Sequence, residues 1–383
     1  MNERKSGLRN AALMLLGCTL ALTVFGLVML YEVASPGRAA ASVVSRQVVA
    51  LILGAAGAGL VLWADYGWIR RLAWPLYSLA VGLLAYALVW GRVVNGARRW
   101  IYVAGVGFQP SDFAKVALLM ALAAYCSSAG SRITSFKDGI LKPALIVGLV
   151  TLLIFVEPDW GTALILGLAA AVMLLVAGIR LRYALIPSVL LTIAVGTALC
   201  YNGLRMERID SWLDLESTRR VVGYQAWQAR LAFASGGPVG LGFSASTQRA
   251  FVPECQTDFI FAIIGEEFGF LGSLLLLGAF AMILHAGLRI AREAPDRFGA
   301  LLATGISFLL AGQALCNMAV VSGALPNKGL TLPFVSQGGS NLMMMLVSVG
   351  VLLRIARAGE DHFEVEEEPL SLFDHPSVVV NEP

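Results

Sequence analysis

Asp258 is the acidic residue with the clearest opportunity for chemistry, because it lies where a polar segment gives way to an apolar one in FVPECQTDFIFAIIGEEFGF (251–270). A carboxylate held at the boundary between water and lipid suits chemistry on a substrate with a lipid tail and a water-facing head. A structural interpretation competes, because Thr257 or Asp258 could cap a helix that begins at FIFAII. The residues alone leave both interpretations open.

The run QPSDFAK (109–115) holds a second candidate group. Pro110 and Ser111 predict the start of a helix with Ser111 as its cap. Asp112 and Lys115 lie three residues apart, hence on one helix face, and are expected to pair. Capping does not account for Lys115, because the helix dipole disfavours a cation near the N-terminus. Since an ionisable residue at membrane depth is by default a functional candidate, we predict a role for Lys115 at the site.

Two arginines, Arg98 and Arg99, lie in the predicted outer loop 91–111, although outer loops are normally poor in Lys and Arg. Cations at the outer lipid boundary suit a bound anion, such as a phosphate or pyrophosphate head group. The alternative is that the membrane tolerates these charges, because long loops cross it regardless of charge. That alternative accounts for the arginines of the long loop 204–257 better than for those of the shorter loop.

A glycine-rich turn precedes the last apolar run, in NKGLTLPFVSQGGSN (327–341). Backbone N–H groups of such a turn can hold an anion at a helix N-terminus. The binding candidates in this turn are Ser336, Gly338, Gly339 and Ser340. An ordinary capped turn is the alternative.

Other acidic residues receive a structural interpretation. For Glu157 and Asp159 we favour a tight outer turn, with Asp159 near the start of a helix. Glu266 and Glu267 follow Asp258 closely in sequence and are expected to be interfacial. Gly265 and Gly269 have a spacing that favours close helix packing.

The elements that must position these residues are predicted to be membrane helices. The chain has 383 residues, of which 58% are hydrophobic and only 14% are charged. Its repeated apolar stretches of about 20 residues match the thickness of a hydrocarbon core. We therefore predict an all-α polytopic membrane protein. Ten spans are expected, at 11–31, 46–64, 72–90, 112–128, 142–156, 160–178, 183–203, 265–288, 298–319 and 341–358.

The distribution of charge predicts how the chain crosses the membrane. With the N-terminus inside, the short inner loops are rich in Lys and Arg, which places both termini in the cytoplasm. A membrane domain then covers 1–359, with one large extracytoplasmic loop at 204–257 between spans seven and eight. This loop contains an amphipathic stretch at 223–234, followed by glycines that permit close backbone approach. The acidic residues 360–383 are expected to form a disordered cytoplasmic tail.

Composition and motifs argue against several classes of protein. The net charge of +3 gives no reason to expect a nucleic-acid partner, and the five cysteines are too dispersed for a disulfide framework or a zinc site. The sequence has no G-x-x-x-x-G-K-[ST] loop, no metalloprotease histidine pair and no nucleophile elbow. Nucleotide hydrolysis is therefore not expected.

Four segments occur in a fixed order along the chain: NGARRWI (95–101), QPSDFAK (109–115), VPECQTDFIFAIIGEEFG (252–269) and LPNKGLTLPFVSQGGSN (325–341). Together with ten predicted spans and one long outer loop before the eighth, they resemble the SEDS family of shape, elongation, division and sporulation proteins. The run KGLTLPF (328–334) is more similar to the cell-division branch, FtsW, than to the elongation branch, RodA. The family usually has Glu where this chain has Asp112.

The resemblance implies a peptidoglycan glycosyltransferase that polymerises lipid II into glycan strands at the outer face of the bacterial cytoplasmic membrane. Asp258 then corresponds to the family's essential carboxylate, the general base for an inverting displacement of undecaprenyl pyrophosphate. Asp112 and Lys115 correspond to its acidic-and-lysine pair, and Arg98 or Arg99 to its loop arginine. These cations would stabilise the leaving pyrophosphate, a divalent cation such as Mg²⁺ or Mn²⁺ would be compatible with the site, and no organic cofactor is expected.

The resemblance also implies partners. These are the substrate lipid II, a class B penicillin-binding protein that acts as transpeptidase, other divisome or elongation proteins, and membrane lipids, with no nucleic acid. Two alternatives stay open: a lipid II flippase or transporter, which would also need outer arginines, and a non-catalytic divisome scaffold. The absence of a clear internal repeat and the clustering of ionisable residues on one side favour chemistry at one face over transport.

Overall fold

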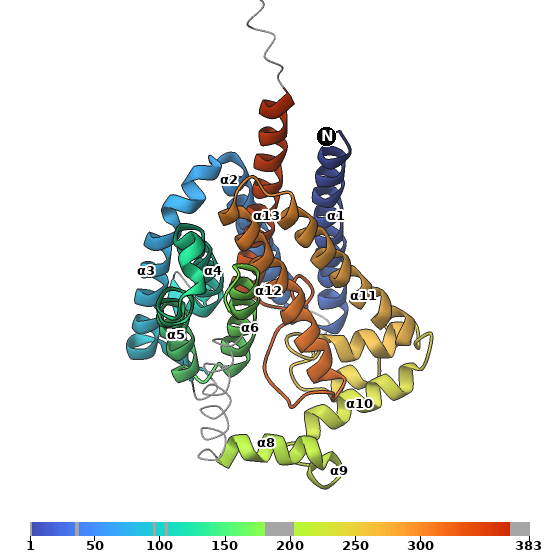
Figure 1. The fold of residues 1–383 in the computed structure, drawn as a ribbon. Helices are drawn as coiled ribbons and strands as arrows, with labels where there is room; N and C mark the ends of the chain where they lie inside the picture. Colours follow the sequence, from blue (N-terminus) through green and yellow to red (C-terminus); the bar gives the residue numbers. More distant parts are fainter. Residues whose placement is uncertain (1, 35–37, 95–96, 104–105, 181–202, 368–383) are drawn as a thin grey trace, which may run out of the picture.

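The computed structural model describes residues 2–34, 38–94, 97–103, 106–180 and 203–367 of the chain (Figure 1). Within these described residues, eight helices are long and apolar enough to cross a membrane, and a shorter apolar helix accompanies them. The bounds of the helices that carry these segments are α1 Asn2–Val33, α2 Arg38–Trp63, α3 Tyr66–Trp90, α4 Pro110–Ala129, α5 Lys142–Val156, α6 Trp160–Val176, α11 Ile260–Arg292, α12 Arg297–Val321 and α13 Gly339–Glu367. The prediction of an all-α polytopic membrane protein is confirmed. The predicted span at 183–203 falls almost entirely outside the described residues, so the number of ten spans stays a prediction.

Shorter elements lie between the spans. The stretch before α4 forms a small antiparallel sheet of β1 Arg92–Val94, β2 Ala97–Val103 and β3 Val106–Phe108, where a loop is predicted. The large loop contains α8 Gly203–Leu213, α9 Leu215–Thr218, α10 Tyr224–Gly236 and the 3-10 turn η3 Gln248–Ala250. A 3-10 turn, η1 Gly130–Thr134, and a π-helical turn, η2 Lys137–Leu141, connect α4 to α5.

The two ends of the helical bundle differ. The N-terminus of α1 and the C-terminal end of α13 lie at one end, whereas α8, α9 and α10 lie at the other (Figure 1). Both described ends of the chain are therefore on one side, opposite the large loop.

Helices α4 and α12 form the centre of the bundle. In their most apolar windows 72% of the residues are buried, against 22% in those of α2 and α11. Helix α4 is rich in alanine and contacts α3, α5, α6, α12 and α13. Small side chains allow helices to approach closely in a membrane, where packing replaces the hydrophobic effect as the driving force. The first turn of α4, which carries Asp112, is therefore enclosed by other helices.

Helix α11 is broken at Gly269, whose φ of +65° suits glycine. The glycine-rich segment after α10 runs beside this break and pairs with it. The backbone N–H groups of Phe270 and Leu271 donate to Gly237 and Pro238, while those of Leu241 and Gly242 donate to Glu266 and Glu267. These bonds satisfy polar groups that the break would leave unpaired. The predicted close backbone approach is confirmed.

The two glutamates before the break are not interfacial, as expected from sequence, but fully buried. Glu266 accepts hydrogen bonds from Ser246, Thr247 and Gln248 of the large loop. The loop folds back over the start of α11, which removes this carboxylate from water and satisfies it. The prediction for Glu266 and Glu267 was therefore wrong because loop packing is not visible in local sequence.

The C-terminal helix is longer than predicted. Helix α13 continues to Glu367, so residues 360–367 of the predicted disordered tail are helical. Glutamate is a good helix former, and Pro369 is the first residue that disfavours continuation. Residues 368–383 lie outside the described part of the chain.

Candidate active site

Asp258 lies two residues before α11, and its carboxylate is not used as a helix cap. Helix α11 begins at Ile260, with Phe259 at the N-cap position and no side-chain capping bond. The backbone oxygen of Asp258 accepts a hydrogen bond of 2.8 Å from Asn317. Its carboxylate forms no hydrogen bond or ion pair to other described residues, and a Cβ atom on Gly329 would lie 2.8 Å from its Oδ2. The glycine leaves room for a free carboxylate beside the last outer loop.

The surroundings of Asp258 adjust its acidity. Burial raises its pKa to about 7, the negative charges of Glu254 and Asp159 act in the same direction, and Arg99 opposes them. A general base works best when its pKa is near the operating pH. The carboxylate of Asp258 therefore has the freedom and the acidity that proton transfer near neutral pH requires.

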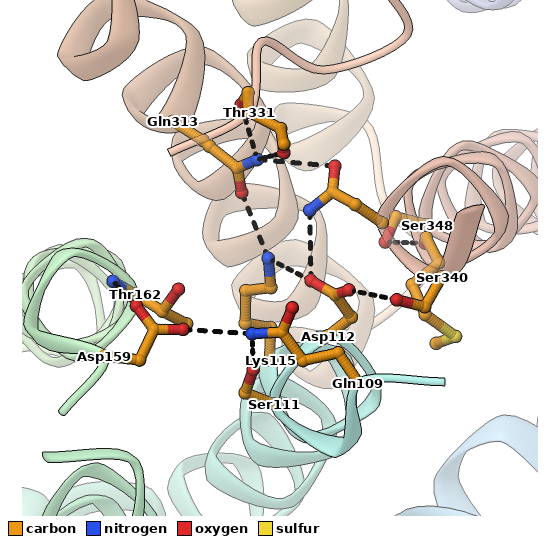
Figure 2. Close-up of polar contacts among 12 residues, drawn as sticks. Gln109, Ser111, Asp112, Lys115, Asp159, Thr162, Gln313, Thr331, Ser340 and Ser348 are labelled. Carbon is orange, nitrogen blue, oxygen red and sulfur yellow. Dashed lines mark hydrogen bonds and ion pairs between the residues drawn. The ribbon is translucent and has the colours of Figure 1, made fainter. Parts of the chain in front are cut away.

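Asp112 and Lys115 form the predicted pair in the first turn and a half of α4 (Figure 2). Lys115 Nζ lies 2.9 Å from Asp112 Oδ1 and donates to Gln313 Oε1 at 3.1 Å. The two oxygens of Asp112 also accept from Ser340 Oγ at 2.7 Å and from Asn341 Nδ2 at 3.0 Å. All five residues are buried. The pair thus binds α4 to α12 and α13.

The amide of Gln313 closes this network. Its Nε2 donates to the Thr331 carbonyl at 3.0 Å and lies 3.4 Å from Asn341 Oδ1. The result is a ring of polar contacts from Lys115 through Asp112, Asn341 and Gln313 back to Lys115 (Figure 2). A buried polar network with its partners in place fixes the positions of the elements that carry it.

The start of α4 differs from the prediction that Ser111 caps it. The helix begins at Pro110, and Gln109 is the N-cap residue, without a side-chain capping bond. Proline is favoured at the first helical position, which moves Ser111 inside the first turn. Instead of capping, Ser111 Oγ accepts from Gln109 Nε2 at 2.9 Å, and the same amide donates to Asp159 Oδ2 at 3.1 Å.

Asp159 caps a helix and also affects the pKa of Asp258. Its side chain accepts from the backbone N–H of Thr162 and so caps α6, which confirms the structural interpretation. Burial raises the pKa of Asp159, while Arg99 and Lys115 lower it. The charge of Asp159 raises the pKa of Asp258, and the charge of Lys115 lowers the pKa of Asp159. Asp159 therefore interacts electrostatically with both residues.

The two loop arginines point to opposite sides of β2, as neighbours in a strand do. Arg98 is exposed, and its Nη1 donates to the Val89 carbonyl at 2.7 Å. Arg99 acts on Asp258, Asp159 and Glu157, and its Nε is buried without a hydrogen-bond partner among the described residues. Arg99 therefore belongs with a group of acidic side chains, Asp258, Asp159 and Glu157, and Arg98 lies on the other side of the strand.

Glu157 is a member of this group that the sequence did not identify as functional. It is 1% exposed, and within the described part of the chain its two carboxylate oxygens have no hydrogen-bond partner. Burial and Asp159 raise its pKa to about 8, against the effect of Arg99. Arg99 is thus the cation that three carboxyl groups share.

The glycine-rich turn is occupied by protein contacts, unlike the open anion site predicted from sequence. The N–H of Gly338 donates to the Gln47 side chain at 3.2 Å, and that of Gln337 to the Gln256 carbonyl at 2.9 Å. Ser336 Oγ accepts from the N–H of Leu332 at 2.9 Å. Gly339 begins α13, and Ser340 bonds Asp112. These residues hold the last outer loop in place beside the site.

Sequence reasoning missed two amides on α12. Asn317 Nδ2 donates to the backbone oxygens of Asp258 and Leu330, and Gln313 bonds Lys115. The two residues lie four apart and therefore share a helix face. Their polar character inside an apolar span, at this spacing, is the signal that could have identified them.

The chain is similar over most of its length to proteins of one family. A family model described as "Cell cycle protein", which covers FtsW, RodA and SpoVE proteins, matches residues 12–361. The probable peptidoglycan glycosyltransferase FtsW of Trichlorobacter lovleyi is 38% identical over 352 residues, which are 90% of this chain and 92% of that protein. Stage V sporulation protein E of Bacillus subtilis is 37% identical over 354 residues, which are 90% and 96% of the two chains.

Two solved structures have the same fold. A chain from a peptidoglycan synthase complex that coordinates polymerization and crosslinking has a TM-score of 0.78 and 32% identity, and the match covers 90% of this chain and 97% of that one. The rod shape determining protein RodA of Thermus thermophilus has a TM-score of 0.67 and 29% identity, with 90% and 95% covered. Together with the helical architecture, these similarities show that the chain is a multi-pass membrane protein of the FtsW/RodA/SpoVE family, the SEDS family that its motifs resemble.

Proposed function

We propose that this protein is a peptidoglycan glycosyltransferase that polymerises lipid II at the outer face of the bacterial cytoplasmic membrane. The observation that carries the proposal is the free carboxylate of Asp258, with a pKa of about 7, at the junction between the large loop and α11. Similarity over 90% of the chain to a protein named as a probable peptidoglycan glycosyltransferase supports it.

The reaction joins a sugar hydroxyl of one substrate to the anomeric carbon of another. Asp258 accepts the hydroxyl proton as the oxygen attacks, and such general-base assistance is worth about 10²–10⁴-fold in rate. The bond between the anomeric carbon and undecaprenyl pyrophosphate breaks in the same displacement, so the configuration at that carbon inverts. The leaving pyrophosphate carries away the electron pair and needs no proton at its departure.

Arg99 stabilises the negative charge that builds on the leaving pyrophosphate. Its buried Nε has no protein partner among the described residues, and a bound anion would satisfy this unpaired donor. Lys115, in contrast, is bonded to Asp112 and Gln313, so it contributes its charge from a fixed position and holds α4, α12 and α13 together. Arg98 lies on the opposite side of β2 and has no part in this step.

Four helices, α4, α6, α11 and α13, begin at this side of the bundle near the proposed site. The N-terminus of a helix carries a partial positive charge, so these helices favour an anionic group there. A divalent cation, Mg²⁺ or Mn²⁺, also stays a proposal. No three His, Cys, Asp or Glu side chains in the described part of the chain are arranged to hold a metal ion. Such a cation would therefore take most of its ligands from pyrophosphate and water.

The orientation and partners follow from the same proposal. Both termini face the cytoplasm, and α8, α9 and α10 face outward. The partner is a class B penicillin-binding protein that crosslinks the new strand, in agreement with the similar chain from a peptidoglycan synthase complex. Other division or elongation proteins would bind the same assembly.

One experiment separates the candidate functions. The purified protein, alone and with its matching class B penicillin-binding protein, is given labelled lipid II in proteoliposomes. We expect polymer from the wild type and none from Asp258→Asn. Transfer of lipid II between leaflets without polymer would instead support a flippase, and neither activity would support a scaffold.

A further inference from the structure

A cavity of about 180 Å³ lies outside the proposed catalytic group, between α8, α10 and the segment that follows α12. We call it the arginine pocket. Its polar lining comes from Arg208, Ser211 and Trp212 of α8, Gln225 and Arg230 of α10, and Asn327 beyond α12. The two helices that line it, α8 and α10, lie at the end of the bundle opposite both termini (Figure 1).

The walls of the arginine pocket are connected by hydrogen bonds. Trp212 Nε1 donates to the Gly323 carbonyl at 2.9 Å, which ties α8 to the end of α12. Asn327 Nδ2 donates to Gln225 Oε1 at 3.1 Å, which ties the last outer loop to α10. The shape of the pocket is therefore held before any ligand enters.

The charged residues that line the arginine pocket are all positive. Arg208 and Arg230 both line it, and neither guanidinium forms an ion pair or hydrogen bond within the described part of the chain. No Asp or Glu is among the lining residues. The acidic residues of α8, Glu207 and Asp210, are not among the residues that line the pocket. Two unpaired guanidiniums in a preformed pocket are a site for a carboxylate or a similar planar anion.

The position of the pocket restricts which anion can bind in it. Asn327 lines the pocket, and Gly329, two residues further, stands against the carboxylate of Asp258. Two residues of chain span at most about 7 Å. A ligand in the pocket is therefore close to the reacting sugar. The pyrophosphate of the substrate is already assigned to Arg99, so the pocket receives a second anionic group of the same substrate.

We propose that the arginine pocket binds a free carboxylate of the peptide carried by the sugar substrate. This proposal rests on the proposed function, because it assigns part of the same substrate. It makes the outer helices α8 and α10 a recognition element for the peptide, separate from the group that transfers the sugar.

The test compares two substrates on the full-length protein in proteoliposomes. One is lipid II with its complete peptide, and the other is lipid II with the peptide carboxylates converted to amides. The variant is the double substitution Arg208→Gln and Arg230→Gln. The control is Arg220→Gln, an exposed arginine of the same loop that lines a different cavity. Thermal unfolding checks that each variant is folded.

We expect the double variant to raise KM for the complete substrate by about tenfold or more, since hydrogen bonds to charged groups contribute about 1.5–3 kcal/mol. Its kcat, and its KM for the amidated substrate, should stay within twofold of the wild type. Lysine at both positions should restore part of the loss. An equal loss on both substrates, or no loss on either, would overturn the proposal.

A binding measurement separates this proposal from the catalytic one. Anisotropy of a labelled free peptide tests the pocket without turnover. Binding by the wild type and not by the double variant supports the pocket even if no polymer forms, in which case only the proposed function fails. Equal binding to both proteins, or loss of binding when phosphatidylglycerol is added to the bilayer, would overturn the pocket's assignment to the peptide.

Discussion

At the scale of single residues, the site divides into side chains that have protein partners and side chains that do not. Asp112 and Lys115 are fully engaged with each other and with α12 and α13. The carboxylate of Asp258 and the Nε of Arg99 have no hydrogen-bond partner within the described part of the chain. A group already bonded to protein holds the framework, whereas an unbonded one is free to meet substrate. Catalysis is therefore expected from Asp258 and Arg99.

The raised pKa of Asp258 predicts how activity depends on pH. A general base must be ionised, so the rate of polymer formation should rise through about pH 7 and level off above it. Asp258→Asn should lower the rate by at least about 10²-fold at every pH. Initial rates measured with labelled lipid II between pH 5.5 and 9 check this. A wild-type rate that is flat over this range would contradict the role of Asp258.

The pH dependence of protein stability tests the raised pKa of Asp258 independently of activity. A carboxyl group with a raised pKa in the folded state destabilises the fold as pH rises from its unfolded value, about 3.9, to its folded value, about 7. Asn cannot ionise, so Asp258→Asn should be more stable than the wild type at pH 8 and closer to it at pH 4. Thermal unfolding in detergent measures the difference.

Asn317 is predicted to position Asp258 without touching substrate. Its amide donates to the backbone oxygens of Asp258 and Leu330. Asn317→Ala should lower kcat by about tenfold with little change in KM, because loss of a buried hydrogen bond costs about 1–3 kcal/mol. Cys316→Ala, at the neighbouring position on α12, is the control. A rise in KM at unchanged kcat would instead indicate that Asn317 binds substrate.

At the scale of elements, the break in α11 determines where the large loop can pack. Gly269 has a left-handed backbone, and the glycine-rich segment after α10 pairs with the chain on both sides of it. A Cβ atom at position 269 would lie 2.7 Å from the backbone of Val239. The break therefore needs glycine for its conformation and for the space beside it.

Gly269→Ala is predicted to destabilise the protein and to loosen the large loop. The backbone conformation of Gly269 (φ 65°, ψ −162°) is nearly restricted to glycine, and its cost for alanine, on the order of 1–3 kcal/mol, adds to the clash with Val239. Gly278→Ala is the matched control in the same helix, because a Cβ atom there meets nothing within 4 Å. Since alanine favours helix, that change should be neutral or stabilising by up to about 1 kcal/mol. Equal unfolding temperatures for the two variants would contradict this account.

At the scale of the whole molecule, the sequence predicted what depends on neighbouring residues and missed what depends on packing. The spans follow from apolar length, and the pairing of Asp112 with Lys115 follows from helical spacing. The bond from Lys115 to Gln313 joins positions 198 residues apart, and no local pattern contains it. The burial of Glu266 likewise depends on a loop that folds back over α11. Arg98 and Arg99 could have been separated from sequence, had the strand been recognised.

The placement of Asp258 at the junction between the large loop and α11 has a consequence for energy coupling. In the proposed orientation the large loop faces outward, so a proton released there returns to the medium outside the cell. One turnover then moves no net charge through the membrane's electric field. Moving a whole charge across the field would change the energy by about 2.3 kcal/mol per 100 mV. Polymer formation in proteoliposomes should therefore be indifferent to a potassium diffusion potential of either sign, and to uncouplers. The bond to pyrophosphate would then be the sole source of energy for extending the strand.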